Sequence, residues 1–208
     1  MFLINNKTLL YGASGHAKVI CSIFESMDVI VDSIFDDNIN NKFLNNYKVI
    51  NCYDSKYESD LPILISIGNN IIRKRISEKV SHTFSTAIHS TSIIDDIAKV
   101  GFGTAIFHSA TIQRDAFIGK HCIINTNASI DHDCIINDFV HISPSATLCG
   151  NVKVGEGSHI GAGATIIPNI NIGKWCVIGA GAVITKDVPD YSLVVGVPGK
   201  IIKKLKND

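Results

Sequence analysis

Aliphatic residues occupy every sixth position of one register over about half of the chain, without a break. A period of six fits neither the 3.6-residue period of an α-helix nor the two-residue alternation of a single strand. It is typical of the hexapeptide repeat of a parallel β-helix, whose chain turns a corner every six residues. The repeated positions are Ile88, Ile94, Val100, Ile106, Ile112, Ile118, Ile124, Ile130, Ile136, Ile142, Leu148, Val154, Ile160, Ile166, Ile172, Ile178 and Ile184.

The residue four positions after each repeated aliphatic is nearly always small, as Ala110, Ala128 and Ala146 show. A tightly wound coil has room for one large and one small inward side chain per face, so this pairing predicts a triangular prism. Three faces make a coil of about eighteen residues and an array of a little over five coils. We also expect positive φ angles at the glycines that directly follow an aliphatic position. These are Gly101, Gly119, Gly155, Gly161, Gly173 and Gly179.

The N-terminal part has a different pattern, in which short apolar runs alternate with helical stretches. Such alternation predicts a small Rossmann-like βαβαβ parallel sheet. The expected strands are 8–12, 31–37 and 62–68, the expected helices are 16–27 and 71–80, and 38–46 reads as a surface loop. The chain is thus predicted to contain an α/β domain over 1–84, a β-helix over 85–190 and a C-terminal tail over 191–208.

Composition excludes several classes of function. Nineteen basic and nineteen acidic residues give a formal net charge of zero, so nucleic acid is not an expected partner. No segment reaches the roughly 18 apolar residues that a membrane span needs, which favours a soluble cytoplasmic protein. Of six cysteines, Cys122, Cys134 and Cys176 fall on the small inward position, and their spacing fits no zinc site or disulfide framework.

A glycine turn follows the first predicted strand, at the sheet edge where open α/β proteins bind ligands. Gly12, Gly15 and Lys18 would let a phosphate approach the backbone N–H groups of a helix N-terminus. Asp36 and Asp37 end the next strand, where a carboxylate can reach a ribose hydroxyl. The third glycine of a dinucleotide motif is missing, which favours a nucleoside diphosphate linked to another group. A plain strand-to-helix turn with an exposed lysine is the alternative.

Five segments together resemble one family. They are L-L-Y-G-A-S-G-H-A-K, F-D-D, I-S-I-G-N-N-x-x-R-K-R, the uninterrupted hexapeptide array and V-V-G-V-P-G-K. The chain resembles, over essentially its whole length, the sialic acid O-acetyltransferase and nucleotide-sugar acetyltransferase family, and most of all the bacterial UDP-4-amino-sugar N-acetyltransferases of bacillosamine synthesis. The resemblance implies a homotrimer of left-handed β-helices that uses acetyl-CoA and no metal. The N-terminal domain would hold the nucleotide of a UDP- or GDP-linked sugar.

The same resemblance implies a catalytic pair in S-I-D-H-D-C-I-I-N-D-F-V-H-I-S-P. His132 matches the general base, a role that suits imidazole because it titrates near neutral pH. Asp133 matches a carboxylate that orients the ring, although Asp131 flanks His132 on the other side and the sequence does not decide between them. Gly150 lies eighteen residues after His132, one coil above it, and matches the backbone N–H that binds the thioester oxygen.

Further site residues are implied by the matching motifs. The expected acetyl-CoA contacts are Asn125, His141, Gly150, Ala162, Ala180, Pro198 and Lys200, with Lys174, Lys186 and Lys200 as phosphate partners or solvated lysines. The expected substrate contacts are Gly12, Ser14, Gly15, His16, Lys18, Asp36, Asp37, Gly68 and Asn69. His159 should stack on His141, since eighteen residues separate them. His82, His89, His108 and His121 are expected at the surface or at interfaces.

Three other functions stay open. A sialic-acid-type O-acetyltransferase would share every motif. A zinc carbonic anhydrase can also be a β-helix trimer. The motif of that group contains a pair of histidines five residues apart, and this sequence lacks such a pair. A non-catalytic sugar-nucleotide sensor would keep the fold without needing the His132–Asp133 pair. The nucleotide, the sugar, amine or hydroxyl as the attacking group, and the size of the acyl group are not decided by the residues.

Overall fold

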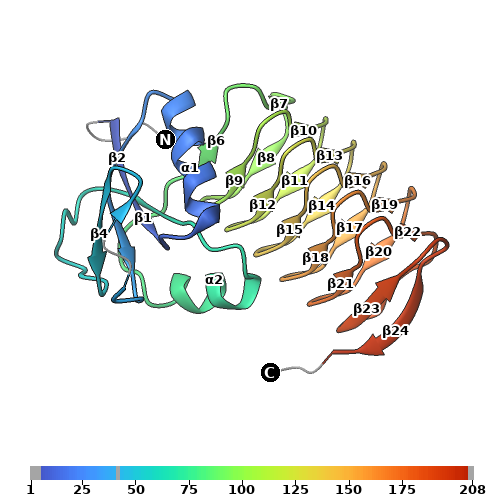
Figure 1. Ribbon diagram of the computed structural model, residues 1–208. Coiled ribbons are helices and arrows are strands. Elements are labelled where there is room, and N and C mark those ends of the chain that lie inside the picture. Colours follow the sequence, from blue (N-terminus) through green and yellow to red (C-terminus); the bar gives the residue numbers. More distant parts are fainter. Residues whose placement is uncertain (1–5, 41–42, 206–208) are drawn as a thin grey trace.

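The computed structural model describes residues 6–40 and 43–205. Figure 1 shows two parts, a small sheet with two helices and a long prism of stacked coils that leads away from it. Both parts predicted from the sequence are therefore present.

The N-terminal part is a five-stranded sheet with the order β3-β4-β2-β1-β5. Strand β1 is parallel to both β2 and β5, and β4 continues the parallel arrangement beyond β2, as the alternating pattern predicted. The stretch expected to be a loop contains β3, which pairs with β4 in an antiparallel hairpin; residues 41 and 42 lie outside the described residues. The elements are β1 (Lys7–Tyr11), α1 (Gly15–Ser26), β2 (Ile30–Asp36), β3 (Phe43–Leu44), β4 (Tyr47–Asn51), β5 (Ile63–Ile65) and α2 (Asn70–Ser77).

The two helices cover opposite faces of this sheet because successive side chains of a strand point to opposite sides. Leu10 of β1 packs in one apolar cluster with Ile20 and Phe24 of α1. Leu9 and Tyr11 pack in a second cluster on the other side, which includes Ile76 of α2. Both faces are thus buried, which explains why the strands read as continuous apolar runs.

The prism is built from two-residue strands that form three flat faces. The first face contains β6 (Ala87–Ile88), β9 (Ala105–Ile106), β12 (Ile123–Ile124), β15 (His141–Ile142), β18 (His159–Ile160) and β21 (Val177–Ile178). The second face contains β7 (Ile93–Ile94), β10 (Thr111–Ile112), β13 (Ser129–Ile130), β16 (Thr147–Leu148), β19 (Thr165–Ile166) and β22 (Val183–Ile184). The third face contains β8 (Lys99–Val100), β11 (Phe117–Ile118), β14 (Ile135–Ile136), β17 (Lys153–Val154) and β20 (Asn171–Ile172).

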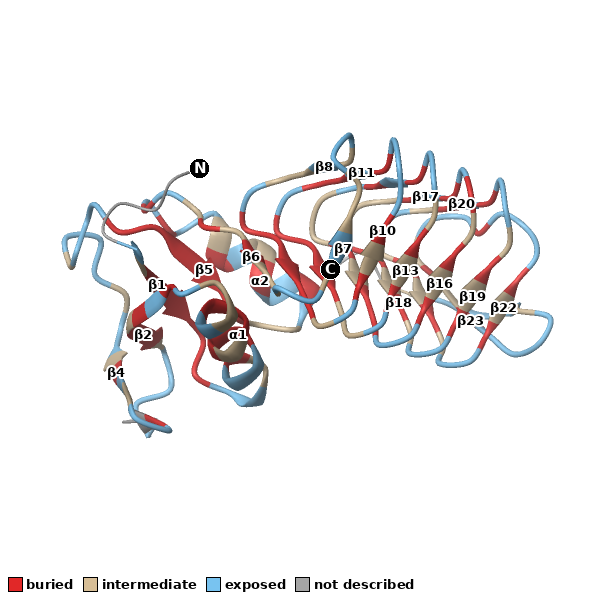
Figure 2. Cartoon of the chain, turned by 90° about the horizontal axis from the view of Figure 1, so that it is seen from above, coloured by how far each residue is buried: buried red, intermediate tan, exposed pale blue. Residues whose placement is uncertain are grey.

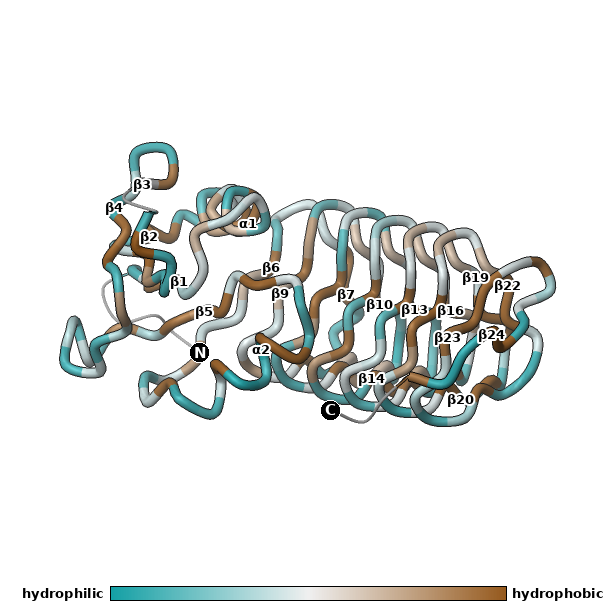
Figure 3. Tube along the Cα trace, turned by 60° about the horizontal axis from the view of Figure 1, so that its bottom comes forward, coloured by the Kyte–Doolittle hydropathy of each residue, from teal (hydrophilic) through white to brown (hydrophobic). Residues whose placement is uncertain are grey.

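Each strand pairs in parallel with the strand eighteen residues away, which confirms the predicted coil. Ile112 of β10, for example, pairs with Ile130 of β13. The second residue of nearly every strand is the repeated aliphatic, and these side chains join the small residues in one continuous core. Figure 2 shows this buried stripe along the prism, and Figure 3 shows apolar residues recurring coil after coil. We call the corners after the first, second and third faces the first, second and third corners.

The positive φ angles lie elsewhere than we predicted. None of the six glycines that directly follow a repeated aliphatic has positive φ. The left-handed residue is instead the third after the repeated aliphatic, for instance Asp133 with φ 59° and Gly157 with φ 69°. The early glycines are needed for a different reason. A Cβ at Gly101 would lie 2.6 Å from the backbone of Gly119 in the next coil, so the corners there approach too closely for a side chain.

Small polar residues inside the third corner connect neighbouring coils. The Oγ1 of Thr104 donates a hydrogen bond to Gly119 O at 2.9 Å and accepts one from Cys122 N at 3.0 Å. The Sγ of Cys122 in turn donates to Asn137 O at 3.1 Å. Cys122 therefore fills the small inward position, as expected, and also satisfies a backbone carbonyl that the core buries.

The C-terminal part closes the end of the prism. Strand β23 (Ser192–Val195) pairs in parallel with β21 on the first face, and β24 (Lys200–Lys204) pairs with it in an antiparallel hairpin. Helices long and apolar enough to cross a membrane are absent from residues 6–40 and 43–205. Over the same residues, no three His, Cys, Asp or Glu side chains gather as they would around a metal ion.

The sheet rests on the beginning of the first face. Ala87, Ala105 and Ile123, the outward residues of β6, β9 and β12, share the apolar cluster of α1. The outward residues of the next two strands, His141 and His159, lie just beyond this contact. The carboxyl edge of the sheet therefore faces the middle of the first face.

Candidate functional site

The predicted catalytic residues lie on the second corner of the β-helix. The Nδ1 of His132 is 2.7 Å from Asp133 Oδ2, whereas Asp131 Oδ1 accepts a hydrogen bond from the His132 backbone N–H at 2.8 Å. Asp133 is thus the aspartate that contacts the ring. This hydrogen bond, with a smaller contribution from the charge of Asp131, raises the pKa of His132 above its ordinary value.

Local backbone geometry makes this contact possible. His132 and Asp133 follow strand β13, and Asp133 holds the left-handed position of the corner. An aspartate tolerates that conformation better than most residues because its short side chain is polar. Both side chains are about 60% exposed, so a ligand can approach the Nε2 atom of the imidazole from solvent.

Gly150 lies directly above His132, as the eighteen-residue coil predicted. A Cβ at this position would be 2.6 Å from Cε1 and 2.7 Å from Nε2 of the ring, so only glycine leaves His132 in place. In the part of the chain that the structure describes, the Gly150 N–H makes no hydrogen bond, while its carbonyl accepts from Asn169 N at 3.0 Å. A backbone N–H beside an imidazole is able to stabilise negative charge that develops on a ligand oxygen next to a base.

A second group of predicted residues lies on the first face. The Nε2 of His141 is 3.1 Å from Asn125 Nδ2, and the His141 ring stacks on the His159 ring with centroids 4.7 Å apart and planes 2° apart. The predicted column of histidines is therefore present. Burial lowers the pKa of His141 to about 3, helped by neighbouring His159 and the charge of Arg73, so this imidazole is neutral near pH 7.

The glycine turn of the sheet approaches this histidine column. The ring of His16 is 6.5 Å from that of His141 and 5.3 Å from that of Phe107, measured between centroids. Its Nε2 is buried without a hydrogen-bond partner among the described residues, and burial lowers its pKa to about 4. A buried nitrogen of this kind is available to a polar group of a ligand.

The turn itself is open at its tip. Gly12 has φ 111°, and a Cβ there would lie 2.6 Å from Cγ1 of Ile67, so the position requires glycine. No atom lies within 4 Å of the Cβ position of Gly15, and Ser14 and Lys18 are exposed. Helix α1 begins at Gly15, so its first N–H groups face this open space.

The two aspartates at the end of β2 already have partners in the protein. Asp36 accepts hydrogen bonds from the backbone N–H of Ala13 at 2.6 Å and of Asn38 at 2.8 Å. Asp37 Oδ1 accepts from the Tyr11 hydroxyl at 2.8 Å; burial and this bond raise the pKa of Tyr11. Asp36 therefore braces the glycine turn, a structural role that the sequence did not suggest.

Gly68 and Asn69 follow β5 at the same edge of the sheet. Asn69 caps helix α2, because its Oδ1 accepts a hydrogen bond from Ile72 N at 3.0 Å. Gly68 has open space at its Cβ position, and its carbonyl accepts from the Arg73 guanidinium at 3.2 Å. Both lie beside the glycine turn because β5 is the neighbour of β1.

A bare backbone ledge runs along the first corner of the upper coils. Ala162 and Ala180 are exposed, and the adjoining Gly163 and Gly181 have no atom within 4 Å of their Cβ positions. An extended ligand can thus lie along this corner without displacing side chains. The remaining predicted cofactor contacts, Pro198 and Lys200, are exposed, and Lys200 is the first residue of β24. Lys174 and Lys186 are exposed as well.

The other histidines are surface or interface residues, as expected. His89 and His108 stack at the first corner with centroids 3.6 Å apart. His82 contacts Tyr53 Oη through Nδ1 at 2.6 Å. His121 is buried against Phe84 at the junction with the sheet, with centroids 4.4 Å apart, and burial lowers its pKa to about 4.

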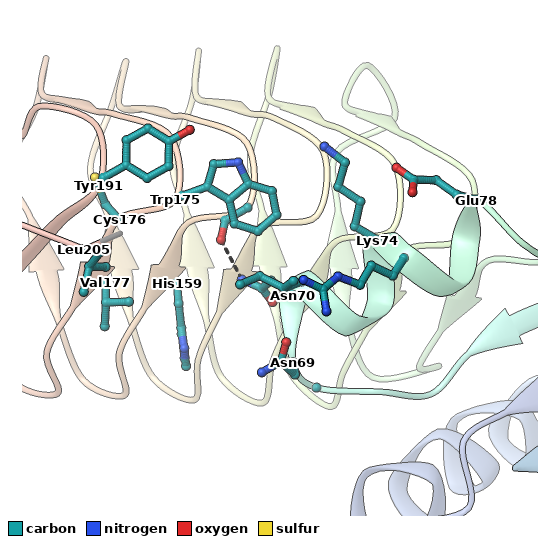
Figure 4. A pocket seen from close by; sticks show the side chains of 14 residues that line it. Asn69, Asn70, Lys74, Glu78, His159, Trp175, Cys176, Val177, Tyr191 and Leu205 are labelled. Carbon is teal, nitrogen blue, oxygen red and sulfur yellow. Dashed lines mark hydrogen bonds between the residues drawn. The ribbon is translucent and has the colours of Figure 1, made fainter. Parts of the chain in front are cut away.

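One cavity was not foreseen from the sequence. It has a volume of about 890 Å³ and lies beside α2, bordered by Asn69, His159, Trp175, Tyr191 and Lys74 (Figure 4). The residues come from α2, the first face, the third corner and the C-terminal end, so no local motif marks it. Only the docking of α2 on the prism creates this cavity.

The predicted residues thus form two groups that one chain does not bring together. His132, Asp133 and Gly150 occupy the second corner, whereas Asn125 and His141 occupy the first face and the first corner. The width of the second face separates them.

Two family models match the sequence. The PglD N-terminal domain matches residues 7–80. The bacterial transferase hexapeptide of six repeats matches residues 133–168 and 151–186.

Several solved structures are similar over nearly the full length of the chain. The H141N variant of perosamine N-acetyltransferase from Caulobacter crescentus, determined with CoA and GDP-perosamine, is 30% identical over the full length of both chains, with a TM-score of 0.90. PerB from the same organism, also determined with CoA and GDP-perosamine, is 31% identical over 98% of this chain and all of its own, with a TM-score of 0.90. The acetyltransferase domain of PglB from Neisseria gonorrhoeae is 32% identical over 95% of this chain and 100% of its own, with a TM-score of 0.88. A structure of that domain with acetyl coenzyme A is also similar.

A curated relative is similar over a shorter stretch. An uncharacterized protein of Acanthamoeba polyphaga mimivirus is 35% identical over 72 residues, which are 34% of this chain and 14% of that protein. The chain therefore spans well under two thirds of this relative's length.

Proposed function

Because this chain belongs to the nucleotide-sugar acetyltransferases that combine a PglD-type N-terminal domain with a hexapeptide β-helix, we propose a specific reaction for it. It transfers the acetyl group of acetyl-CoA to the 4-amino group of a deoxy sugar linked to UDP or GDP. Acetyl-CoA-dependent N-acetylation of a nucleotide amino sugar is the activity of the family. The position of the amino group, the base and the assembly are the parts proposed here.

One observation supports the proposed chemistry most strongly, namely the contact of His132 with Asp133 at 2.7 Å beneath the free N–H of Gly150. Asp133 accepts from Nδ1 and so leaves Nε2 unprotonated and exposed, which is the tautomer that a general base needs. Its charge also stabilises the imidazolium that forms during the reaction.

The proposed steps follow from this geometry. The sugar amine attacks the thioester carbonyl carbon, a C–N bond forms, and His132 Nε2 removes a proton from the amine nitrogen. The oxyanion accepts a hydrogen bond from the Gly150 N–H. When the oxyanion collapses, the C–S bond breaks and the imidazolium returns its proton to the leaving CoA sulfur. The products are the sugar amide and free CoA thiol.

We assign the nucleotide to the N-terminal turn and the cofactor to the first corner. The open tip at Gly15, the N-terminus of α1 and exposed Lys18 suit a diphosphate. The bare ledge at Ala162 and Ala180 suits the pantetheine arm, with Asn125 and His141 near the acetyl end. We assign the unpartnered Nε2 of His16 to a sugar hydroxyl or to the amine.

The separation of the two groups supports a homotrimer. A neighbouring chain that packs its second corner against the first corner of this chain would bring its own His132 and Gly150 to His141. The active site would then be completed between chains, with acetyl-CoA in the groove between two prisms. Light scattering tests the assembly; a stable monomer with full activity would contradict it.

A thiol-release assay tests the reaction. Acetyl-CoA is supplied with UDP- or GDP-linked 4-amino-4,6-dideoxy sugars, and the matched 4-hydroxy sugars serve as the control. We expect CoA release only with the amino sugars. Release with the hydroxy sugars or with a sialic acid, and none with amines, would make the protein an O-acetyltransferase instead.

A further inference from the structure

Arg73 of α2 is the most completely buried charged residue of the described chain. Only 1% of its surface is exposed, and among the residues that the structure describes no carboxylate forms an ion pair with it. Burying an unpaired charge costs several kcal/mol unless hydrogen bonds replace its water. An arginine at this position therefore destabilises the fold unless the N–H groups of its guanidinium make specific hydrogen bonds.

All of the guanidinium nitrogens are bonded to neutral acceptors. Two bonds lead to the β-helix, from Nε to His121 O at 2.8 Å and from Nη2 to Phe139 O at 2.9 Å. Two others lead to the loop after β5, from Nη1 to Ile67 O at 2.9 Å and to Gly68 O at 3.2 Å. Arg73 therefore joins the substrate edge of the sheet to the third corner of the prism.

Asn70 extends the contact by one coil. Its Oδ1 accepts from Arg73 Nη2 at 2.8 Å, while its Nδ2 donates to Gly157 O at 2.9 Å and to Ser158 O at 3.3 Å. Figure 4 shows the bond of Asn70 to the corner. The three carbonyls of His121, Phe139 and Gly157 are eighteen residues apart and belong to successive coils.

The hydrogen bonds of Arg73 and Asn70 to three successive coils hold the sheet on the prism and also fix its orientation there. An apolar contact tolerates sliding, whereas a planar fork satisfies its bonds at a single offset and angle. A tilt of the sheet, or a shift by a fraction of a coil, would break these bonds and leave a buried charge unsatisfied. The positive charge also helps to lower the pKa of His16 and His141, because it lies near both.

We propose that Arg73, together with Asn70, is a positioning residue that sets the offset and angle of the N-terminal sheet on the β-helix, and thereby the place of the nucleotide-linked amine relative to the acetyl site. The inference rests on the proposed function for its second half. The first half concerns geometry alone and can be tested without a substrate.

Pulsed electron–electron distances between spin labels at Lys48 of β4 and Lys153 of β17 test the geometry. Both residues are exposed, and labels on encoded ketone amino acids leave the six cysteines untouched. Labelled chains are diluted with unlabelled protein so that each assembly carries one pair. We expect a narrow distance distribution that becomes broad in Arg73→Met and less broad in Arg73→Lys.

Kinetics test the consequence. A misplacement of about 1 Å can cost about 10²-fold in rate, so Arg73→Met should lower kcat/KM for the amino sugar by that order. Acetyl-CoA affinity should stay within about twofold, since the ledge at Ala162 and Ala180 belongs to the β-helix alone. Asn70→Ala provides a milder variant if Arg73→Met unfolds. Lys79→Met removes an exposed charge just after α2 and should change nothing.

The outcomes separate the two claims. A distribution as narrow as wild type in both Arg73→Met and Asn70→Ala overturns the inference, whatever the activity. Broadening with turnover within threefold of wild type shows that position does not matter for the reaction and also overturns it. If wild type acetylates no nucleotide amino sugar, the proposed function fails, and the distances alone decide whether Arg73 sets the geometry.

Discussion

His132 and His141 are nine residues apart on the same β-helix, yet their surroundings are opposite. His132 is exposed at a corner, and a hydrogen bond to Asp133 raises its pKa. His141 is stacked on His159 in a buried site, and burial lowers its pKa to about 3. The first is able to accept a proton and hold it, while the second stays neutral and can only donate or accept a hydrogen bond. Environment, rather than residue type, gives the two imidazoles opposite pKa shifts and suits them to the two roles proposed for them.

Substitution of His132 should lower the rate far more than substitution of His141. Loss of a general base typically costs 10²–10⁴ in rate, so His132→Ala should lower kcat by that order with acetyl-CoA binding nearly intact. His141→Ala should lower kcat less and weaken acetyl-CoA binding more. Steady-state kinetics with both substrates check this. A His132→Ala enzyme that keeps more than about a tenth of wild-type kcat would move the base to another residue.

Gly150 sharpens the role of the second corner. The Cβ of Gly150→Ala would lie 2.6 Å from His132 Cε1, so the ring must move while the backbone N–H remains. We expect kcat to fall by about 10², the cost of a small misplacement at a reacting centre. Lys79→Met, which removes an exposed charge just after α2, is the control. Equal kinetics of wild type and Gly150→Ala would refute the contact.

Buried histidines should make stability depend on pH. Burial lowers the pKa of His121 to about 4 in the folded chain. Between about pH 4 and 6.5, this histidine is therefore protonated in the unfolded chain and neutral in the folded chain. Its contribution is complete above pH 6.5 and is lost as pH falls toward 4, at a cost of roughly 3 kcal/mol. Denaturant unfolding at pH 7.5 and 4.5 measures this. His121→Gln should reduce the pH dependence and half-exposed His108→Gln should not; the reverse result would count against it.

The smallest expected effect concerns the N-terminal turn. Lys18→Ala should raise KM for the nucleotide sugar about tenfold, the usual scale of one charge-assisted hydrogen bond, and leave KM for acetyl-CoA unchanged. Lys48→Ala, equally exposed on β4, is the control. Asp36 is a poorer target than the sequence suggested, since its removal would release the Ala13 N–H and loosen the turn. Equal weakening of both substrates by Lys18→Ala would show that the ligands share this site.

Features that depend on local pattern were predictable from the sequence. Each strand of the prism obeys the same six-residue rule, so the eighteen-residue stacking of His132 with Gly150 and of His141 with His159 followed directly. The choice of Asp133 over Asp131 did not, because it depends on a left-handed backbone angle at the corner. For the same reason, the expected positive φ was assigned to the wrong glycines.

Features that depend on docking were not predictable. Arg73 reads as one cation of an exposed-looking helix, and nothing in its neighbours indicates that the carbonyls of His121 and Phe139 will surround it. The cavity beside Trp175 arises from the same docking. Asp36 matched a ribose-binding pattern, yet its backbone partner Ala13 is twenty-three residues away and becomes visible only in the fold.

Nitrogen NMR of the histidine rings measures the opposite protonation behaviour of His132 and His141, with assignments from His132→Gln and His141→Gln. We predict that His132 titrates above about pH 6.5 and that Asp133→Asn moves this pKa downward. We also predict that His141 stays neutral throughout the range from pH 5 to 8. A His141 ring that gains a proton near neutral pH, with His132 titrating below it, would contradict the assignment of the two roles.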